Sequence, residues 1–481
     1  MDRVEIVVDN IWGRITTRLP TEVLTYIANK TRYHPAGYDK TWNYKKGRWD
    51  GYNYTFDVNN QVFRAGLLSR ICYCLDHFSI KYGIIRDSSR TNARTAEASL
   101  EPGVIRPIDF QTKIRQVVRD NERGIIASPT GTGKTVMVSL VIDELKRRTL
   151  VILNDLVLLD QMHRALGRYF PDAKLGYIGN TEFDLGDITV ATIQSLRSIA
   201  GLQESKKDKG EHPNKQKFID WLGGVGCIIH DEVHLADSDS CLLFYGIASA
   251  TDRIYGFSAT PYAWAEKQQS SANIELEQVF GKIIYSTFGL DFIELGLKVP
   301  CIVKQVELKP RVKAYGTFRD NQAELYKKAL QFEIMQDPAW HHAVLESVRE
   351  FTKDNMTCFV YAGHKLEYGE TLAKMLGAPF VQGKTKRAER FRIFDAVESK
   401  QIPVIVSDIG GVGLDIPSLD AFVLASDVKD IRQFRGRVER SSPKTGKQFG
   451  HFVDIWKDCS FLNKHHTLRE NQYKEGGNII L

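Results

Sequence analysis

The stretch from residue 124 to residue 145 constrains the fold of this chain more than any other feature. An apolar run at 124–127 is followed by the residues SPTGTGKT at 128–135, and helical spacing continues to Leu145. This order predicts a strand, a glycine-rich turn and a helix. In such a turn the backbone N–H groups and the positive end of the helix surround a phosphate group.

The residue types of this turn suit a bound nucleoside triphosphate. Lys134 can reach the β- and γ-phosphates, and the Thr135 hydroxyl can ligate Mg²⁺. The general pattern has Gly at position 128 where this chain has Ser, so the match is incomplete. The sequence therefore predicts ATP and Mg²⁺ as cofactors. The expected nucleotide-binding residues of the turn are Thr130, Gly131, Thr132, Gly133, Lys134 and Thr135.

A second polar cluster follows a buried strand about a hundred residues later, where the apolar run 225–229 leads into HDEVH at 230–234. Asp231 at the end of a parallel strand can hold a hydrated Mg²⁺, and Glu232 can orient or deprotonate the attacking water. An acidic pair standing alone would indicate a solvated turn. The spacing of His230 and His234 does not match a zinc site, so we expect His234 to couple the ATP site to its neighbours.

Strands alternate with helices in two successive series, which predicts two tandem α/β lobes with parallel sheets behind a small α+β N-terminal domain. The expected boundaries are 1–98, 99–290 and 291–481, with a linker at 87–99. The first series of expected strands is 124–128, 150–154, 188–191, 227–230 and 254–258; the second is 358–361, 379–381, 403–407, 421–425 and 449–454. The polar stretch 201–217 indicates a mobile surface insertion, or else a lysine-rich DNA contact.

Composition narrows the class of protein. A chain of 481 residues exceeds one hydrophobic core, and no run of 18 apolar residues or signal peptide is visible. We expect no membrane association and a cytoplasmic protein. Seven cysteines without a CxxC pair argue against a disulfide framework and a zinc site. The net charge is +6, and residues 1–100 hold 15 Lys and Arg against 10 Asp and Glu, so this segment is the first candidate for phosphate contacts.

Three short motifs in sequence resemble motifs I, II and III of the superfamily 2 helicases: GTGKT at 131–135, DEVH at 231–234 and SATP at 258–261. The resemblance implies two RecA-like lobes, and it implies that Ser258 and Thr260 link the ATP site to the nucleic-acid track.

RPIDFQ at 106–111 resembles the Q motif, which implies that Gln111 reads adenine. TIQSL at 192–196 resembles a phosphate-contacting strand, which implies nucleic-acid contacts by Thr192 and Gln194. Asn154 and Asp155 depart from the Pro-Thr of motif Ia, and an acid there would repel a phosphate.

The second lobe continues the resemblance. QFRGRVER at 433–440 matches motif VI, which implies that Arg437 and Arg440 stabilise the γ-phosphate in the transition state and that Gln433 couples the sites. The alternative is a solvated basic helix face. SDIGGVGLDIP at 407–417 resembles motif V, which implies that its glycines approach the nucleic-acid backbone and that its Asp helps connect the lobes; Gly413 and Asp415 are candidate nucleotide-binding residues. Gly383, followed by Glu389 and Arg390, matches the stretch before motif V. Hydrolysis is expected to open and close the cleft between the lobes.

The N-terminal stretch 42–51, WNYKKGRWDG, interleaves aromatic and basic residues. Such a stretch predicts stacking on bases and phosphate contacts by Lys45, Lys46, Arg48 and Trp49; an aromatic mini-core is equally consistent with it. This stretch and residues 63–78 look similar to UvsW-like phage helicases. That resemblance implies action on forks, D-loops, R-loops and four-way DNA in recombination, repair and replication, in a host cytoplasm if the chain is phage-encoded.

Two other functions stay open. One is an RNA helicase or RNA–protein remodeller, because the motor motifs do not reveal the sugar. The other is a nucleic-acid-binding P-loop switch without strand separation, which the intact Lys134, Glu232 and Arg437 oppose. The expected partner is branched or forked DNA, with RNA possible within R-loops. The sequence names no protein partner, oligomeric state or direction of travel.

Overall fold

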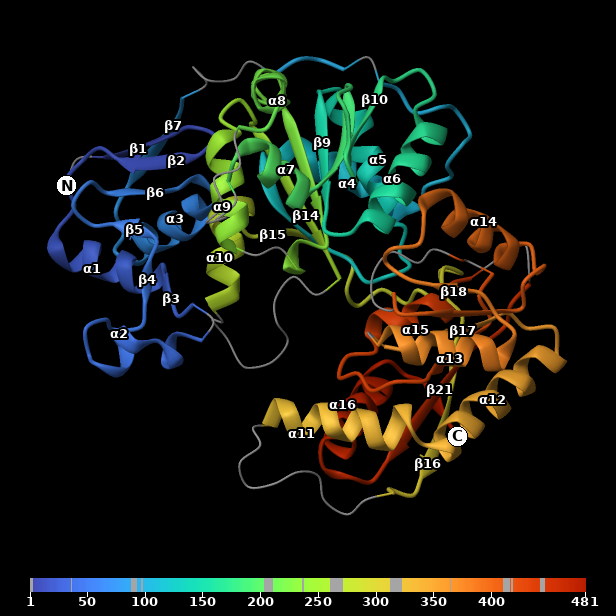
Figure 1. Ribbon diagram of the computed structural model, residues 1–481. Coiled ribbons are helices and arrows are strands. Elements are labelled where there is room, and N and C mark those ends of the chain that lie inside the picture. The colour runs from blue at the N-terminus through green and yellow to red at the C-terminus, as the bar shows by residue number, and fades with distance from the viewer. Residues whose placement is uncertain are drawn as a thin grey trace. The chain divides into compact units, whose positions relative to one another are not determined.

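The protein is described from a computed structural model (Figure 1), which describes residues 3–481 except 36, 88–92, 97, 203–210, 236–237, 260–270, 312–321, 364, 410–415, 417 and 442–445. Contacts divide the chain into two compact units. The first comprises Met1–Pro129 and Gly133–Gly289, and the second comprises Leu290–Leu481 with Thr130–Thr132.

The N-terminal part of the first unit is built on a five-stranded sheet with the order β5-β6-β2-β1-β7. Alternating buried and exposed residues in β1 explain why one face of this sheet carries a core, against which α1 and α3 pack. A separate pair, β3 and β4, and the short helix α2 lie beside this sheet. The elements are β1 (Val4–Val8), β2 (Trp12–Ile15), α1 (Thr21–Lys30), β3 (Arg32–Tyr33), η1 (Tyr38–Lys40), α2 (Trp42–Lys45), β4 (Asn53–Tyr54), β5 (Phe56–Asp57), β6 (Val62–Arg64), η2 (Ala65–Leu67), α3 (Leu68–His77) and β7 (Tyr82–Arg86).

The rest of the first unit is an eight-stranded sheet with the order β11-β10-β12-β9-β13-β14-β8-β15. All neighbouring strands are parallel except β10 and β11, and helices cover both faces (Figure 1). The strands are β8 (Arg123–Ala127), β9 (Thr149–Leu153), β10 (Leu175–Gly179), β11 (Glu182–Asp184), β12 (Ile188–Thr192), β13 (Cys227–Asp231), β14 (Arg253–Ser258) and β15 (Ile283–Ser286). The helices are α4 (Asp109–Asp120), α5 (Lys134–Leu145), α6 (Leu156–Tyr169), α7 (Ile193–Ala200), α8 (Lys215–Leu222), η3 (Val233–Leu235), α9 (Ser238–Ile247) and α10 (Ser271–Phe280).

The N-terminal sheet is fastened to this larger sheet through helix α10. Ile274 of α10 lies in the hydrophobic core of the N-terminal domain, and Glu277 forms an ion pair with Arg70 at 2.5 Å. Arg123 donates to the carbonyls of Asn10 (2.8 Å) and Val279 (3.0 Å), one on each side of the junction. Apolar burial and charge-assisted hydrogen bonds therefore hold the two parts together.

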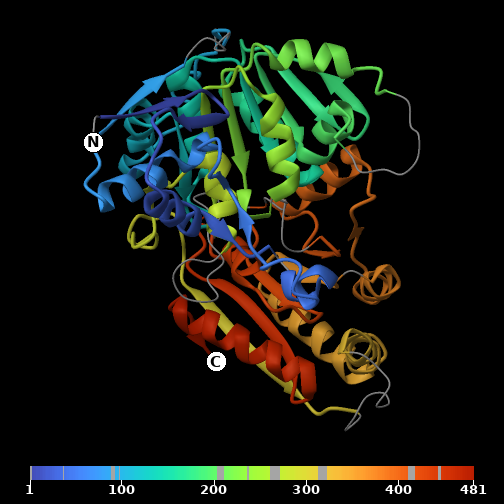
Figure 2. The same ribbon diagram turned by 90° about the vertical axis from the view of Figure 1, so that its left-hand side faces the viewer.

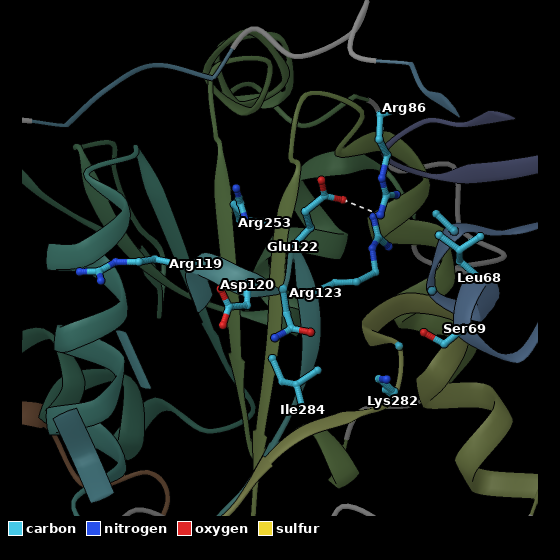
Figure 3. Close-up of a pocket in the computed structure, with 14 residues that line it drawn as sticks. Leu68, Ser69, Arg86, Arg119, Asp120, Glu122, Arg123, Arg253, Lys282 and Ile284 are labelled. Carbon is cyan, nitrogen blue, oxygen red and sulfur yellow. Dashed lines mark ion pairs between the residues drawn. The ribbon is translucent and has the colours of Figure 1, made fainter. Parts of the chain in front are cut away.

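A pocket of about 280 Å³ lies at this junction and is lined by basic side chains (Figure 3). Arg86 pairs there with Glu122 at 2.9 Å, while Arg123 is engaged with the two backbone carbonyls. Arg86 and Arg123 therefore already have partners within the junction.

The second unit is built on a seven-stranded sheet with the order β18-β19-β17-β20-β21-β16-β22, in which every neighbouring pair is parallel. The C-terminal helix α16 packs on β21 (Figure 2, red). The strands are β16 (Cys301–Leu308), β17 (Cys358–Tyr361), β18 (Phe380–Val381), β19 (Val404–Ser407), β20 (Ala421–Leu424), β21 (Gly450–Lys457) and β22 (Ile479–Ile480). The helices are α11 (Gln322–Leu330), the π-helical turn η4 (Gln331–Met335), α12 (Pro338–Lys353), α13 (Leu366–Leu376), α14 (Arg387–Glu398), α15 (Arg432–Val438) and α16 (Ser460–Glu475).

The predicted fold class is confirmed: both larger sheets are of the parallel α/β kind. The apolar runs expected as strands correspond to β8, β9, β12, β13 and β14 in the first unit and to β17–β21 in the second. The expected linker at 87–99 is partly packed, because Thr95 pairs with Arg147 and Ala98 is buried. Residues 203–210 of the expected insertion at 201–217 lie outside the described residues, and the end of this stretch begins helix α8. In the part of the chain that the structure describes, no helix has the length and apolar character needed to cross a membrane.

A buried ion triad lies within the second unit. The fully buried Lys457 contacts Glu333 at 2.7 Å and Asp337 at 2.5 Å. We expect Lys457→Met to cost about 3–5 kcal/mol in the free energy of unfolding, because two buried carboxylates lose their counter-ion. Denaturant unfolding measures this cost. Lys304→Met is the matched control, because Lys304 pairs with Glu350 on the exposed surface; equal destabilisation by both variants would contradict the prediction.

Candidate functional site

The predicted phosphate-binding turn connects β8 to α5 as expected. Gly131 and Gly133 adopt φ values of 80° and 79°, in the left-handed region that a side chain disfavours. Gly133 is the N-cap residue of α5, and Lys134 begins the helix. The free N–H groups of this helix end therefore face the turn, where they can bind a phosphate group.

The acidic pair at the end of β13 lies beside this turn. Lys134 Nζ is 2.5 Å from Glu232 Oε1, and both side chains are nearly buried. This ion pair brings the two halves of the expected ATP site together across 98 residues of sequence. Glu232 also has a φ of 49°, and a non-glycine residue held in the left-handed region stores strain that is common at functional sites.

Burial and neighbouring charges shift the pKa values of Asp231 and Glu232 in opposite directions. Burial raises the pKa of Asp231, with the charge of Glu232 adding to the effect and Lys134 opposing it. Burial also opposes ionisation of Glu232, but the Lys134 ammonium and His234 hold the pKa of Glu232 below its ordinary value. The two carboxyls thus differ in protonation tendency, as expected for side chains with different roles.

The oxygen atoms near this pair suit Mg²⁺. Thr135 supplies a hydroxyl at the start of α5, and Asp231 supplies a carboxylate at the carboxyl end of β13. Within the described residues no group of three or more His, Cys, Asp or Glu side chains could hold a metal ion.

The motif II histidine links the acidic pair to the end of β14. His234 Nδ1 is 2.7 Å from the Ser258 hydroxyl and 3.3 Å from Glu232 Oε2. The Ser258 carbonyl in turn accepts from the backbone N–H of Ser128 at the phosphate-binding turn. The contacts fit the coupling role expected of His234 and Ser258. Thr260 lies outside the described residues. Burial lowers the pKa of His230 to about 3, so this ring stays neutral.

Gln111 lies against the same turn. Its Oε1 accepts from the backbone N–H of Ile108 at the start of α4, and a Cβ placed on Gly133 would be 2.5 Å from its Nε2. One end of the Gln111 amide therefore closes the first turn of α4, while the other end lies beside the turn that is expected to bind ATP.

The residues after β9 and β12 have local roles in the fold. Asp155 caps α6 by accepting from the Val157 N–H at 2.6 Å, which gives the unexpected acid a structural purpose. Asn154 Nδ2 donates to the Glu232 carbonyl at 3.2 Å. Thr192 is buried and caps α7 through its hydroxyl, whereas Gln194 is exposed.

In the second unit, the predicted motif VI residues lie on and just after α15. Gln433 and Arg437 belong to this helix. Arg440 follows the helix, and its backbone forms an isolated antiparallel β-bridge with the backbone of Lys298. Gly383 follows β18, and its carbonyl accepts from the Arg390 guanidinium at 3.2 Å. Gly413 and Asp415 lie outside the described residues.

The N-terminal stretch 42–51 has features of both interpretations offered by the sequence. His34 stacks between Tyr38 and Tyr52, with ring centroids 4.0 and 3.8 Å away, so a small aromatic core exists. Trp49 belongs to this core, because it is partly buried and its indole N–H donates to the Tyr52 carbonyl at 2.9 Å.

Other side chains of this region face solvent. Trp42 is 56% exposed and Tyr54 is 50% exposed, and the Arg48 guanidinium lies 4.4 Å from the centre of the Trp42 ring. Lys45 and Lys46 are exposed next to them. We call Trp42, Lys45, Lys46 and Arg48 the aromatic-basic surface.

Sequence reasoning did not single out Tyr54, and within the stretch 42–51 it singled out Trp49 rather than Trp42; it named Asn154 only as a departure from motif Ia. The position of Asn154 at the carboxyl end of a parallel strand was a usable signal, because ligands bind at that edge. Which of Trp42 and Trp49 is exposed depends on how the small aromatic core packs, so the spacing of residues in the sequence could not predict it.

Comparisons with known proteins agree with these motifs. The family described as "Type III restriction enzyme, res subunit" matches residues 93–263. The DNA 3′-5′ helicase XPB of Mycobacterium tuberculosis is 24% identical over 318 residues, which cover 64% of this chain and 53% of that protein. This chain spans about half the length of the first curated helicases that it matches.

Among solved structures, Dbp5 of S. cerevisiae bound to RNA and ADP BeF3 has a TM-score of 0.52 at 15% identity, covering 79% of this chain and 93% of that chain. T4 UvsW has a TM-score of 0.45 at 17% identity and covers 100% of this chain and 98% of its own. At this identity the likeness to Dbp5 shows a shared fold. The order of the motifs, the parallel sheets that carry them and the helicase matches make this chain similar to the helicases of superfamily 2.

Proposed function

We propose that this protein is an ATP-driven DNA helicase or translocase that unwinds or branch-migrates branched DNA. The observation that carries the proposal is the Lys134–Glu232 contact, because it joins a phosphate-binding turn to a carboxylate that can serve hydrolysis. Lys134 contacts the β- and γ-phosphates, and Glu232 orients the attacking water. Thr135 and Asp231 hold Mg²⁺, which neutralises phosphate charge when bound.

The remaining sequence-derived roles belong to the same proposal. Arg437 and Arg440 supply positive charge to the γ-phosphate in the transition state, and Gln111 contacts the adenine. His234 and Ser258 transmit the state of the ATP site, a role that their 2.7 Å contact supports. Gly383 and Gln194 contact the nucleic-acid backbone, and Gly413 and Asp415 of the motif V segment contribute to nucleotide binding.

Steady-state ATPase activity tests the proposal most directly. It should be measured without nucleic acid and with single-stranded DNA, forked DNA, four-way DNA and matched RNA. Strong stimulation by forked and four-way DNA supports a motor for branched DNA. Stimulation by RNA alone would favour an RNA helicase, and ATP binding without stimulated turnover would favour a P-loop switch.

The aromatic-basic surface supports a DNA contact by the N-terminal domain. An exposed indole offers a face for base stacking, which contributes about 1–3 kcal/mol per base in single-strand binding, and neighbouring cations meet phosphates. Because Ile274 of α10 is buried in the N-terminal core, deleting residues 1–98 would expose apolar surface on the motor lobe. Point variants are therefore the sharper test.

We expect Trp42→Ala to weaken binding to forked DNA about 5- to 100-fold, the range set by the loss of one stacked base. The same variant should keep the ATPase rate reached at saturating single-stranded DNA. Fluorescence anisotropy with labelled forks measures the binding. Tyr73→Ala is the control, because Tyr73 is 64% exposed on α3 of the same domain and lies outside the surface. Equal losses for both variants would remove the case for this surface.

A further inference from the structure

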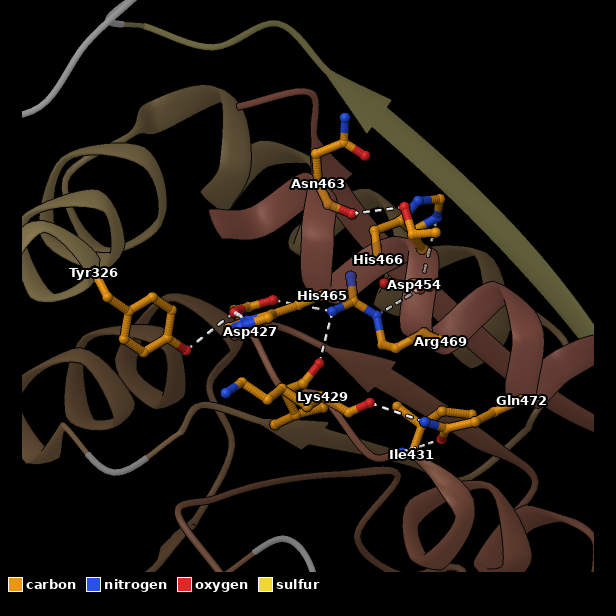
Figure 4. A network of polar contacts seen from close by, with 12 residues as sticks. Tyr326, Asp427, Lys429, Ile431, Asp454, Asn463, His465, His466, Arg469 and Gln472 are labelled. Atoms are coloured by element: carbon orange, nitrogen blue, oxygen red, sulfur yellow. Dashed lines mark hydrogen bonds and ion pairs between the residues drawn. The ribbon is translucent and has the colours of Figure 1, made fainter. Parts of the chain in front are cut away.

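The C-terminal helix α16 holds the segment that leads into helix α15 (Figure 4). Gln472 uses both ends of its side-chain amide: Nε2 donates to the Lys429 carbonyl, and Oε1 accepts from the Ile431 N–H, each at 2.9 Å. Ile431 is the N-cap residue of α15. One turn earlier in α16, Arg469 donates to the Val428 carbonyl at 2.7 Å. Side chains of α16 thus bind the backbone of Val428, Lys429 and Ile431, the segment that precedes α15.

The contact between the two helices is reciprocal. Arg435 of α15 donates from Nη1 to the backbone carbonyl of Gln472 at 2.8 Å, in the last turn of α16. A guanidinium is favoured there because the carboxyl end of a helix carries partial negative charge. The approach is close, because a Cβ placed on Gly476 would lie 2.1 Å from Arg435 Nη1 and would displace this guanidinium. Each helix therefore secures one end of the other.

The α16 side chains next to Gln472 are themselves held in place by buried hydrogen bonds. Arg469 is fully buried and donates from Nε to Asp454 and from Nη1 to Asp427, both at 2.9 Å. Tyr473 and Tyr326 donate to Asp454 and Asp427 respectively. A buried polar network with its members bonded to one another resists rotation of any single side chain. Helix α16 can thus act as a rigid support.

The far end of the motif VI segment is also anchored. Glu439 lies 2.5 Å from Arg435 Nε and 3.0 Å from Lys298 Nζ, and its carbonyl accepts from the Val299 N–H at 2.7 Å. Arg437 lies between these anchors, two residues after Arg435 and two before Glu439. The backbone that carries Arg437 is consequently fixed on both sides.

We propose that Gln472 and Gly476 are positioning residues for ATP hydrolysis, which hold α15 so that Arg437 is presented in a fixed orientation. The proposal rests on the role given above to Arg437. Neither residue is expected to touch the nucleotide. Their contribution follows from the steep dependence of catalysis on placement, where an error of about 1 Å can cost about 100-fold in rate.

The test measures kcat and KM for ATP in the full-length protein at saturating DNA, together with the thermal unfolding midpoint. We expect Gln472→Ala to lower kcat about 10- to 100-fold, with KM and the midpoint near those of the wild type. Asn471→Ala is the matched control, because Asn471 is the exposed neighbour of Gln472 in the same helix. Gly476→Ala is the second variant: it displaces Arg435 but leaves both amide contacts of Gln472 in place, and it should reproduce the loss of kcat.

A double variant distinguishes a loss of Arg437 positioning from a general loss of protein stability. Adding Gln472→Ala to Arg437→Ala should cause no further loss of kcat, because the residue being positioned is already gone. An additive loss, a loss that follows the unfolding midpoint, or a normal kcat in both α16 variants would overturn the inference. If Arg437→Ala is inactive while the α16 variants are normal, only this inference fails. Full activity of Arg437→Ala would instead overturn the catalytic role of Arg437, and this inference with it.

Discussion

Replacing Glu232 by Gln should lower kcat for DNA-stimulated ATP hydrolysis by about 10²- to 10⁴-fold, the range that a general base contributes. The amide keeps the shape of the side chain and can still accept from Lys134, whose ammonium lies 2.5 Å from Glu232 Oε1. It cannot accept a proton from water. ATP and DNA binding should therefore stay within a few-fold of the wild-type values while turnover is lost.

Single-turnover hydrolysis and equilibrium binding of a fluorescent ATP analogue distinguish these effects. Glu101→Gln is the matched control, because Glu101 is an exposed carboxylate of the same unit. Lys134→Ala supplies the contrasting case: it should weaken nucleotide binding as well as turnover, since the ammonium contacts the phosphates before and during reaction. Normal turnover in Glu232→Gln would exclude this carboxylate from the chemistry.

The motor part of the fold could be predicted from sequence because its strands are buried on both faces. Such strands are short continuous apolar runs, as in Leu150–Leu153 and Ile228–Ile229, and each is followed by turn residues. The site could be predicted because parallel strands deliver the residues that follow them to one edge of a sheet. Lys134 and Glu232 are 98 residues apart in sequence, yet topology alone places them near each other.

The strands and contacts that were missed depend on tertiary structure. Strand β16 alternates buried and half-buried residues only from Cys301 to Lys304, so its pattern is weak, and β22 consists of two exposed residues. Asp155 was difficult to interpret because an N-cap and a ligand-facing acid have the same sequence signature. The role of Gln472 was invisible, because its partners at Lys429 and Ile431 are about forty residues away in the chain.

Removing the guanidinium of Arg437 should reduce kcat about 10³-fold or more, because an arginine that meets the γ-phosphate in the transition state contributes about 10³- to 10⁵-fold. KM for ATP should change little in Arg437→Ala, since the interaction strengthens only as charge develops on the transferring group. Arg437→Lys should recover only part of the rate, because an ammonium lacks the planar, two-pronged donor geometry of a guanidinium.

Arg432→Ala is the control for this experiment, because Arg432 lies on the same helix and pairs with Asp430 at the surface. The comparison decides between the two interpretations of the basic motif. A solvated helix face predicts that both variants hydrolyse ATP at near-normal rates and bind DNA slightly less well, with a smaller salt dependence. A catalytic arginine predicts that only Arg437→Ala loses turnover, and that it does so at every salt concentration. The salt dependence of kcat therefore tests whether Arg437 of α15 takes part in ATP hydrolysis or only attracts DNA through its charge.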